Sequence, residues 1–318
     1  MLQDELSNVF DSFVRSIIAV MDDRDPATSG HSMRVARYSL CLARAIHASK
    51  LPSFKHLSFT DDHIEEIRYA ALLHDIGKVV LRRDILLKSA KLKDEDLKHL
   101  LERLDLFAAW FDTQSPEKLM DKYRSPRRFE HYREIVTRIV QADMFPTEEE
   151  RQYLEEMSQT YITSCPSLPL LSRWELESLL IPFGTLNPDE RHEIQKHALT
   201  SWQYLSEIAW PKRWEKVPLI VLQHHEKLNG SGYPYGISGD QILPQSRIIT
   251  VCDIFDAMTG GDRPYKTRHS FGDAAYFLQK EAHNGALDQA IVDIFIDDVV
   301  PQISDPDAAF NSPDSHRP

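Results

Sequence analysis

Apolar residues recur at spacings of three and four along most of this chain, and this helical periodicity constrains the fold more than any other feature of the sequence. Residues 30–48 place His31, Val35, Tyr38 and Leu42 on one face of a helix. The segment "DDHIEEIRYAALLHDIGK" (61–78) predicts another helix, which Gly77 would stop. Strand-like alternation is confined to a short hairpin around Tyr233–Ile242. We therefore predict an all-α helical bundle with at most that one hairpin.

The order of these patterns along the chain predicts five segments. Residues 1–21 form an N-terminal amphipathic helix whose stripe is Leu2, Leu6, Val9, Phe13, Ile17 and Val20. That stripe favours core packing, with an oligomer seam as the alternative. Residues 22–105 and 181–304 read as two parts of one helical domain, separated by a helical insertion at 106–180 with Pro-marked turns. Residues 305–318, rich in Pro, Ser and Asp, predict a flexible tail.

Composition excludes several classes of protein. A chain of 318 residues with 42% hydrophobic and 27% charged residues is typical of soluble globular proteins. No apolar run approaches the roughly 18 residues of a membrane helix, and acidic residues at the N-terminus argue against a secretory signal, so we expect a cytoplasmic protein. The three separated cysteines favour a reducing compartment and argue against a sulfur-ligated zinc site. A net charge of −12 argues against binding polymeric nucleic acid.

Several polar residues lie in apolar surroundings. His74 and Asp75 follow the apolar run "YAALL", and Asp253 lies inside the apolar helix "RIITVCDIFDAMTG", which also carries Asp256. Each feature alone is explained by a hydrogen-bonded or ion-paired core residue. His224 and His225 open the segment "HHEKLNGSGYP", which predicts a helix ended by Asn229 and Gly230. Consecutive helical side chains diverge by about 100 degrees, so one histidine facing inward and one outward is the simpler interpretation there.

The joint order of these residues favours a metal site over separate explanations. The chain offers five histidines and two aspartates, namely His31, His74, Asp75, His197, His224, His225 and Asp253. Seven nitrogen and oxygen donors are too many for one tetrahedral zinc and suit two metals that share a carboxylate. Such donors suit iron, manganese, zinc or nickel, and spacing does not choose among them.

This set resembles the four-residue signature of the HD superfamily of metal-dependent phosphohydrolases, at His31, His74-Asp75 and Asp253. With "HHEKLNGSGYP" and "RPYK" added, residues 20–105 and 180–300 are similar to the HD-GYP subgroup, bacterial phosphodiesterases that open cyclic di-GMP. The resemblance implies an HD-domain bundle and two divalent metals, iron or manganese. It also implies hydrolysis of cyclic di-GMP to linear pGpG, and on to GMP.

The resemblance also assigns roles to individual residues. Asp75 would bridge the two metals and, with Lys78, carry the catalytic work. One metal would be completed by His31, His74 and Asp253, the other by His197, His224 and His225. Lys78, Arg263 and Lys266 would contact phosphate, and Tyr233 of the GYP turn would contact the substrate.

Departures from the family pattern leave alternatives open. Ala27 stands where members with a third metal have glutamate, so two metals are predicted, and Asn229 stands where many members have aspartate. The long interval between His74 and His197 is explained by the insertion. One alternative function is a catalytically weak regulatory module that binds a cyclic dinucleotide and acts through the insertion. Another is hydrolysis of a different cyclic dinucleotide or nucleotide. Further expectations are a homodimer formed through residues 2–21 and a protein partner for residues 106–180.

Overall fold

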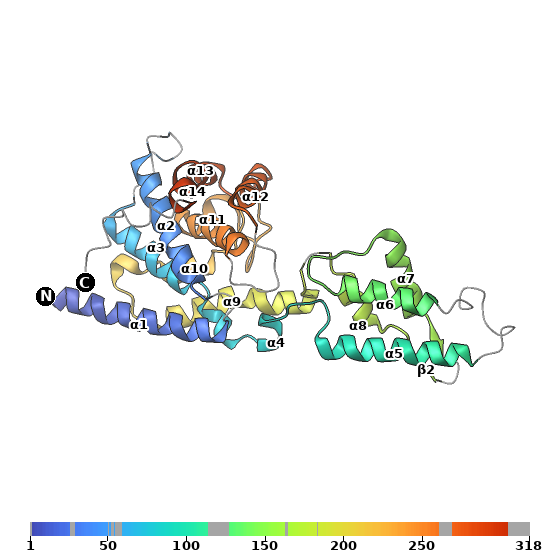
Figure 1. Cartoon of the computed structure of the whole chain (residues 1–318). Coiled ribbons are helices and arrows are strands. Elements are labelled where there is room, and N and C mark those ends of the chain that lie inside the picture. Colours follow the sequence, from blue (N-terminus) through green and yellow to red (C-terminus); the bar gives the residue numbers. More distant parts are fainter. Residues whose placement is uncertain are drawn as a thin grey trace. The chain divides into compact units, whose positions relative to one another are not determined.

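The computed structural model describes residues 2–25, 29–49, 51, 54, 59–113, 127–162, 165–182, 184–260 and 269–304. For residues 2–7, 162, 165–167 and 304 it describes the backbone only. The chain forms two compact units, one of Met1–Leu86 with Glu193–Pro318 and one of Leu87–His192 (Figure 1). The predicted insertion, 106–180, lies within the second unit. No helix of the described part is both long enough and apolar enough to cross a membrane.

Helices are the only regular secondary structure among the described residues of the first unit, as predicted. Its helices are α1 (Leu2–Arg24), α2 (His31–Ala48), α3 (Asp61–Leu73), η3 (Ile76–Val80), α4 (Arg83–Leu86), α9 (Pro188–Ser206, in this unit from Glu193), η6 (Lys212–Trp214), α10 (Val217–Leu222), η7 (Gly239–Gln241), α11 (Pro244–Thr259), α12 (Phe271–His283), α13 (Gln289–Ile294), η8 (Phe295–Val299) and α14 (Val300–Ser304). Helix α2 packs against α3 and α11, and α3 also packs against α10. These contacts bury one apolar core that includes Leu42, Ile67 and Phe255. Helix α3 begins at a capping box, in which Thr60 and His63 satisfy each other's backbone N–H groups.

Helix α1 buries one face and exposes another. Val14 and Ile18 join the core of the first unit, and Phe10 packs edge-on against Tyr69 with 4.9 Å between ring centroids. Val9, Phe13 and Val20 are exposed by 67%, 53% and 59%. The helix therefore has an apolar face toward its own core and a second apolar stripe toward solvent.

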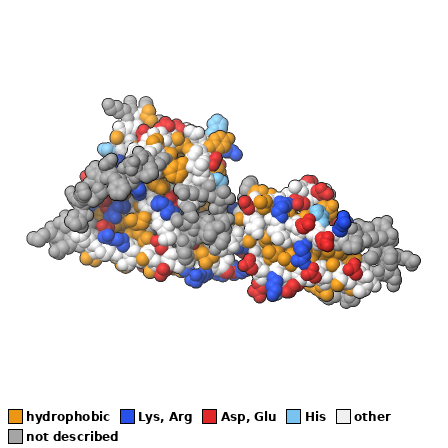
Figure 2. Space-filling view, in the orientation of Figure 1, with side chains coloured by type: hydrophobic (Ala, Val, Ile, Leu, Met, Phe, Trp, Pro, Cys, Tyr) orange, Lys and Arg blue, Asp and Glu red, His pale blue; other side chains and the backbone are white. Residues whose placement is uncertain are grey.

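The second unit has its own core and the only strands among the described residues. Its elements are α5 (Asp94–Asp112), α6 (Arg127–Ile139), α7 (Glu148–Ser158), β1 (Tyr161–Ile162), β2 (Cys165–Pro169) and α8 (Arg173–Leu179). The strands pair antiparallel, and Phe107, Tyr132 and Leu154 belong to the core. Figure 2 shows basic and acidic side chains interspersed over these helices. Lys91 is fully buried, and its ammonium donates to the carbonyls of Met144 at 2.8 Å and Leu179 at 3.3 Å.

The hairpin predicted at Tyr233–Ile242 is wrong. This segment is an irregular loop with one short 3-10 helix, η7. Its backbone N–H groups bond to other acceptors: Tyr233 donates to the His225 carbonyl at 3.2 Å, and Tyr235 donates to the Glu226 carboxylate at 2.8 Å. With these donors used, no cross-strand ladder forms among the residues of this loop.

Candidate metal centre

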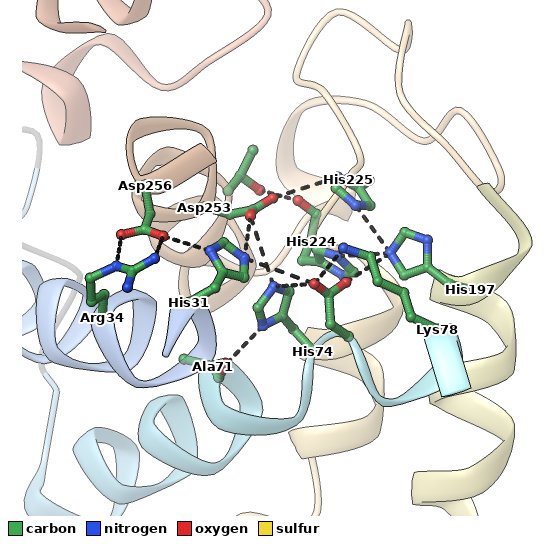
Figure 3. Close-up of polar contacts among 12 residues, drawn as sticks. His31, Arg34, Ala71, His74, Lys78, His197, His224, His225, Asp253 and Asp256 are labelled. Carbon is green, nitrogen blue, oxygen red and sulfur yellow. Dashed lines mark hydrogen bonds and ion pairs between the residues drawn. The ribbon is translucent and has the colours of Figure 1, made fainter. Parts of the chain in front are cut away.

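One set of candidate ligands comes from α2, α11 and the end of α3. His31 is the first residue of α2, Asp253 lies on α11, and His74 follows α3 directly. His31 Nε2 lies 3.1 Å from Asp253 Oδ1, and His74 Nε2 lies 3.8 Å from the same oxygen. Figure 3 shows the three side chains pointing toward one another. The structure therefore brings together three residues that are far apart in the sequence.

A second set comes from α9 and the turn after α10. His197 Nε2 lies 3.2 Å from His225 Nε2 and 3.5 Å from His224 Nε2. His197 and His224 are fully buried, at 1% and 0% exposure. These three nitrogens form a compact cluster of one donor type.

His224 and His225 do not lie in a helix, contrary to the prediction. Helix α10 ends at Leu222, and both histidines belong to the turn that follows. Freed from helical divergence, the two rings lie side by side, tilted by 41° to each other with centroids 3.9 Å apart. Asn229 and Gly230 form a separate turn, in which the Asn229 side-chain oxygen accepts from the Ser231 N–H at 3.1 Å and Gly230 has a φ of 78°.

Asp75 lies between the two sets. Its Oδ1 is 3.3 Å from His197 Nε2, while its Oδ2 is 3.3 Å from His74 Nε2. Oδ2 also accepts from Lys78 Nζ at 2.6 Å. One carboxylate oxygen thus faces each set, which is the arrangement that a bridging carboxylate requires.

Backbone carbonyls orient three of the histidine rings. The Nδ1 atoms of His74, His197 and His224 donate to the carbonyls of Ala71 at 2.8 Å, Ile194 at 2.6 Å and Val221 at 2.6 Å. Because a carbonyl only accepts, each of these Nδ1 atoms carries a proton, and Nε2 is the ring nitrogen left to face the site. This is the tautomer that a metal-ligating histidine needs.

His31 is oriented by a carboxylate instead. Its Nδ1 lies 2.7 Å from Asp256 Oδ2, and Arg34 Nε donates to Asp256 Oδ1 at 2.7 Å. Asp256 and Arg34 were not among the predicted site residues. Their positions carried a usable signal, since each lies three residues after a candidate ligand on the same helix and therefore on the same face.

Gly77 positions the second set relative to Asp75, and its predicted role as the end of a helix is wrong. Helix α3 ends at Leu73, and Gly77 lies in η3. A Cβ on Gly77 would lie 2.2 Å from the His197 carbonyl oxygen and 2.7 Å from the Ser201 nitrogen. Ser201 Oγ accepts from the Gly77 N–H at 2.8 Å and donates to the His74 carbonyl at 2.9 Å. Only glycine allows this contact between η3 and α9.

The donor set fits divalent cations. The Nε2 lone pairs of His197 and His224 face each other at 3.5 Å and repel unless a cation lies between them. The buried His74 Nε2 and Asp75 Oδ1 atoms have no hydrogen-bond partner among the described residues. Metal–nitrogen bonds of about 2.0–2.1 Å place adjacent ligand atoms about 3 Å apart, close to the separations seen here.

The surroundings of the candidate ligands shift the pKa values of their histidines in opposite directions. Burial lowers the pKa of His197 to about 4 and of His224 to about 3, so both rings are neutral at pH 7. For His31, burial acts to lower the pKa, but hydrogen bonds to Asp253 and Asp256 outweigh it and raise the pKa to about 9. Burial acts to raise the pKa of Asp75, but His74 and Lys78 hold it well below its usual range. The carboxylate is therefore ionised, as a metal ligand must be.

The remaining predicted residues fall into two groups. The Tyr233 ring lies against His225, with centroids 4.6 Å apart, and Lys78 is at the edge of the site with 19% of its side chain exposed. Arg263, Lys266 and Ala27 lie outside the described residues, as does the predicted tail at 305–318.

Two models of the HD domain match the chain, one over residues 28–159 and the other over 174–291. The first match contains His31, His74 and Asp75, and the second contains the second set and Asp253. The chain belongs to the HD superfamily. The identification accounts for the paired histidine and aspartate at the centre of the site.

Curated relatives of this HD-superfamily chain are named as cyclic-dinucleotide phosphodiesterases. It is 37% identical over 103 residues to the cyclic di-GMP phosphodiesterase response regulator RpfG of Xanthomonas campestris, covering 32% of this chain and 26% of that protein. It is 35% identical over 100 residues to the 3'3'-cGAMP-specific phosphodiesterase 3 of Vibrio cholerae, covering 31% and 21%. It is 32% identical over 148 residues to a cyclic di-GMP phosphodiesterase of Thermotoga maritima, covering 44% and 39%. The chain thus matches well under half the length of each of these relatives.

Proposed function

We propose that this chain is a two-metal phosphodiesterase of the HD-GYP subgroup that hydrolyses cyclic di-GMP to linear pGpG, and on to GMP. The observation that supports this best is Asp75, whose two oxygens lie 3.3 Å from the Nε2 atoms of His197 and His74. A carboxylate between two nitrogen-rich sets suits a binuclear centre, and such centres hydrolyse phosphate esters. The names of the relatives supply the substrate class. We place the activity in the cytoplasm.

The cations that we propose are two iron ions or two manganese ions. Imidazole and carboxylate donors suit these metals, and the candidate sets contain no thiolate. When bound, such cations would supply Lewis acidity at the phosphate and lower the pKa of water. The protein's own part is to hold the donors in place through the Nδ1 hydrogen bonds described above.

Lys78 is the residue proposed to meet the substrate phosphate. Its ammonium lies 2.6 Å from Asp75 Oδ2 and remains partly exposed, so it can contact a phosphate oxygen while staying beside the bridging carboxylate. Arg263 and Lys266 are proposed as further phosphate contacts from the resemblance. Tyr233, whose ring covers His225, is proposed to line the substrate side of the second set.

Purified protein loaded with ferrous iron or manganese under reducing conditions tests the proposal. We expect turnover of cyclic di-GMP to pGpG and no measurable turnover by Asp75→Asn. His47→Ala is the matched control, because His47 is exposed in the last turn of α2, the helix that begins at His31. An absence of turnover of any cyclic dinucleotide, with two metals bound per chain, would refute the proposal.

A substrate panel separates the alternatives. Cyclic di-GMP, 3'3'-cGAMP and nucleotide monoesters are compared at equal concentration, and faster hydrolysis of cGAMP would reassign the substrate within the same chemistry. A module that only binds nucleotide is not favoured, because all seven candidate ligands converge and three of their rings are locked in the metal-binding tautomer.

We also propose a homodimer formed through residues 2–21. The support is the exposed stripe of Val9, Phe13 and Val20, whose spacings of four and seven match a coiled-coil seam. We expect the solution mass to rise from monomer to dimer with concentration, and Phe13→Lys to prevent this. A monomer mass at all concentrations would refute the dimer.

A further inference from the structure

The loop that joins the second set to α11 is held by its backbone rather than by a strand. Gly239 donates to the Leu228 carbonyl at 3.0 Å, and Tyr233 donates to the His225 carbonyl at 3.2 Å. A Cβ on Gly232 would lie 2.4 Å from the Lys227 nitrogen and 2.5 Å from the Glu226 Cα, so this glycine lies directly on the backbone that follows the two histidines. The loop and the turn that carries the two histidines therefore pack tightly against each other.

Glu226 lies where the loop and the histidine turn meet. Its side chain is buried, with 2% of the residue exposed, and Oε1 accepts from the Tyr235 N–H at 2.8 Å. Burial raises the pKa of Glu226, and the backbone N–H groups of Tyr235, Ile237 and Gly236 act against this rise by favouring the ionised carboxylate. Gly236 has a φ of 64°, and successive N–H groups around a left-handed residue form a concave site for an anion. The carboxylate occupies this site from within the chain.

The loop held in this way carries Tyr233 onto the candidate ligands. The Tyr233 ring is tilted by 32° to the His225 ring at 4.6 Å, and its centroid lies 6.4 Å from that of His197. Tyr233 follows Gly232 and lies two residues before Tyr235. Its position is therefore fixed on one side by the His225 carbonyl and on the other by Glu226.

A purely structural role explains Glu226 poorly. Its Oε2 atom is buried without a hydrogen-bond partner among the described residues. A buried carboxylate that is only partly satisfied adds little stability, since desolvation offsets its hydrogen bonds. Features that weaken a fold in this way concentrate at functional sites.

We propose that Glu226 is a positioning residue for the second set of ligands. Its carboxylate holds the loop 229–242 so that Tyr233 packs on His225 and restricts the rotation of that imidazole. Glu226 thereby controls the affinity of the second cation and the placement of Tyr233 at the substrate side. This inference rests on the proposed two-metal function.

The test compares Glu226→Gln and Glu226→Ala with wild type in the full-length, manganese-loaded protein. Glu66→Gln is the matched control: Glu66 is equally buried at 2%, accepts a backbone N–H from Lys216 at 3.0 Å, and its hydrogen-bond partners Lys216 and Gln245 lie outside the loop. The readouts are hydrogen exchange of residues 229–242 and the affinity for each manganese by chelator competition. Neither readout requires turnover, so an inactive wild type would refute the proposed function and leave these results interpretable.

We expect Glu226→Ala to accelerate exchange in 229–242 and to weaken the second manganese by about 10–100-fold, the usual effect of losing an outer-shell partner. Glu226→Gln keeps an oxygen for the Tyr235 N–H and its volume, so it should fold and give an intermediate effect. Glu66→Gln should match wild type in both readouts. In a Tyr233→Ala background, Glu226→Ala should have little further effect on manganese affinity, because the two residues act through one contact. Unchanged exchange and affinity in both Glu226 variants would overturn the inference, as would additive effects in the double variant.

Discussion

Asp256→Asn tests how the first set of ligands is held. Asp256 is 2% exposed, and its carboxylate lies 2.7 Å from His31 Nδ1 while accepting from Arg34 Nε at 2.7 Å and Nη2 at 3.1 Å. An asparagine keeps one oxygen for the His31 N–H or for Arg34, and its amide N–H₂ must face the other donor. The variant therefore loses the charge that supports His31 and places donor against donor.

The expected magnitude follows from this contact. Losing an outer-shell partner of a metal-bound histidine costs about 10–100-fold in metal affinity, which corresponds to about 1.4–2.7 kcal/mol. The loss should fall on one cation only, because Asp256 is hydrogen-bonded to His31, whereas His197 and His224 are oriented by backbone carbonyls. Two-site manganese titrations with a competing chelator would resolve the two affinities.

An exposed aspartate provides the control for Asp256→Asn. Asp297→Asn makes the same chemical change at an exposed position in η8 and should match wild type. If Asp256→Asn leaves both manganese affinities unchanged, Asp256 does not support His31. If both affinities fall equally, the variant has disturbed the whole site and the assignment to one set is wrong.

Three further perturbations have defined outcomes. Gly77→Ala should lower the unfolding free energy by about 1–3 kcal/mol and weaken the second manganese, because the new Cβ meets the His197 carbonyl; an unchanged melting temperature would contradict this. Burial lowers the pKa of Lys91 to about 8 in the folded protein. Between about pH 8 and 10.5 the unfolded chain therefore binds more protons than the folded protein, so the free energy of unfolding should rise with pH, by about 3 kcal/mol at most. Urea unfolding of wild type and Lys91→Met across this pH range would show that rise only in wild type. Chelation should lower the melting temperature, and manganese at about a hundredfold excess over its Kd should restore about 2.7 kcal/mol per site, as calorimetry can measure.

Much of the candidate site was predictable because residue type and helical period are local properties. Apolar spacing predicts the helices that carry His31 and Asp253, and the rarity of polar residues in such runs draws attention to His74 and Asp75. His197 was included only through the joint order of the histidines and aspartates, because no local pattern connects it to the others. Asp256 and Arg34 could also have been predicted from the sequence, since each follows a candidate ligand by three residues on the same helix.

The sequence by itself determined which donors the chain contains and that they are carried on helices. Tertiary structure decided how they meet, because convergence depends on contacts between distant segments. The contact of Gly77 and Ser201 places His197 beside Asp75, although their segments are far apart in the chain. Helix α10 ends at Leu222, earlier than the pattern predicts, and this lets His224 and His225 face one site. The buried Glu226 carboxylate accepts the Tyr235 N–H, which would otherwise be free for strand pairing in a hairpin. The loop that carries Tyr233 therefore folds onto the site instead of forming a hairpin.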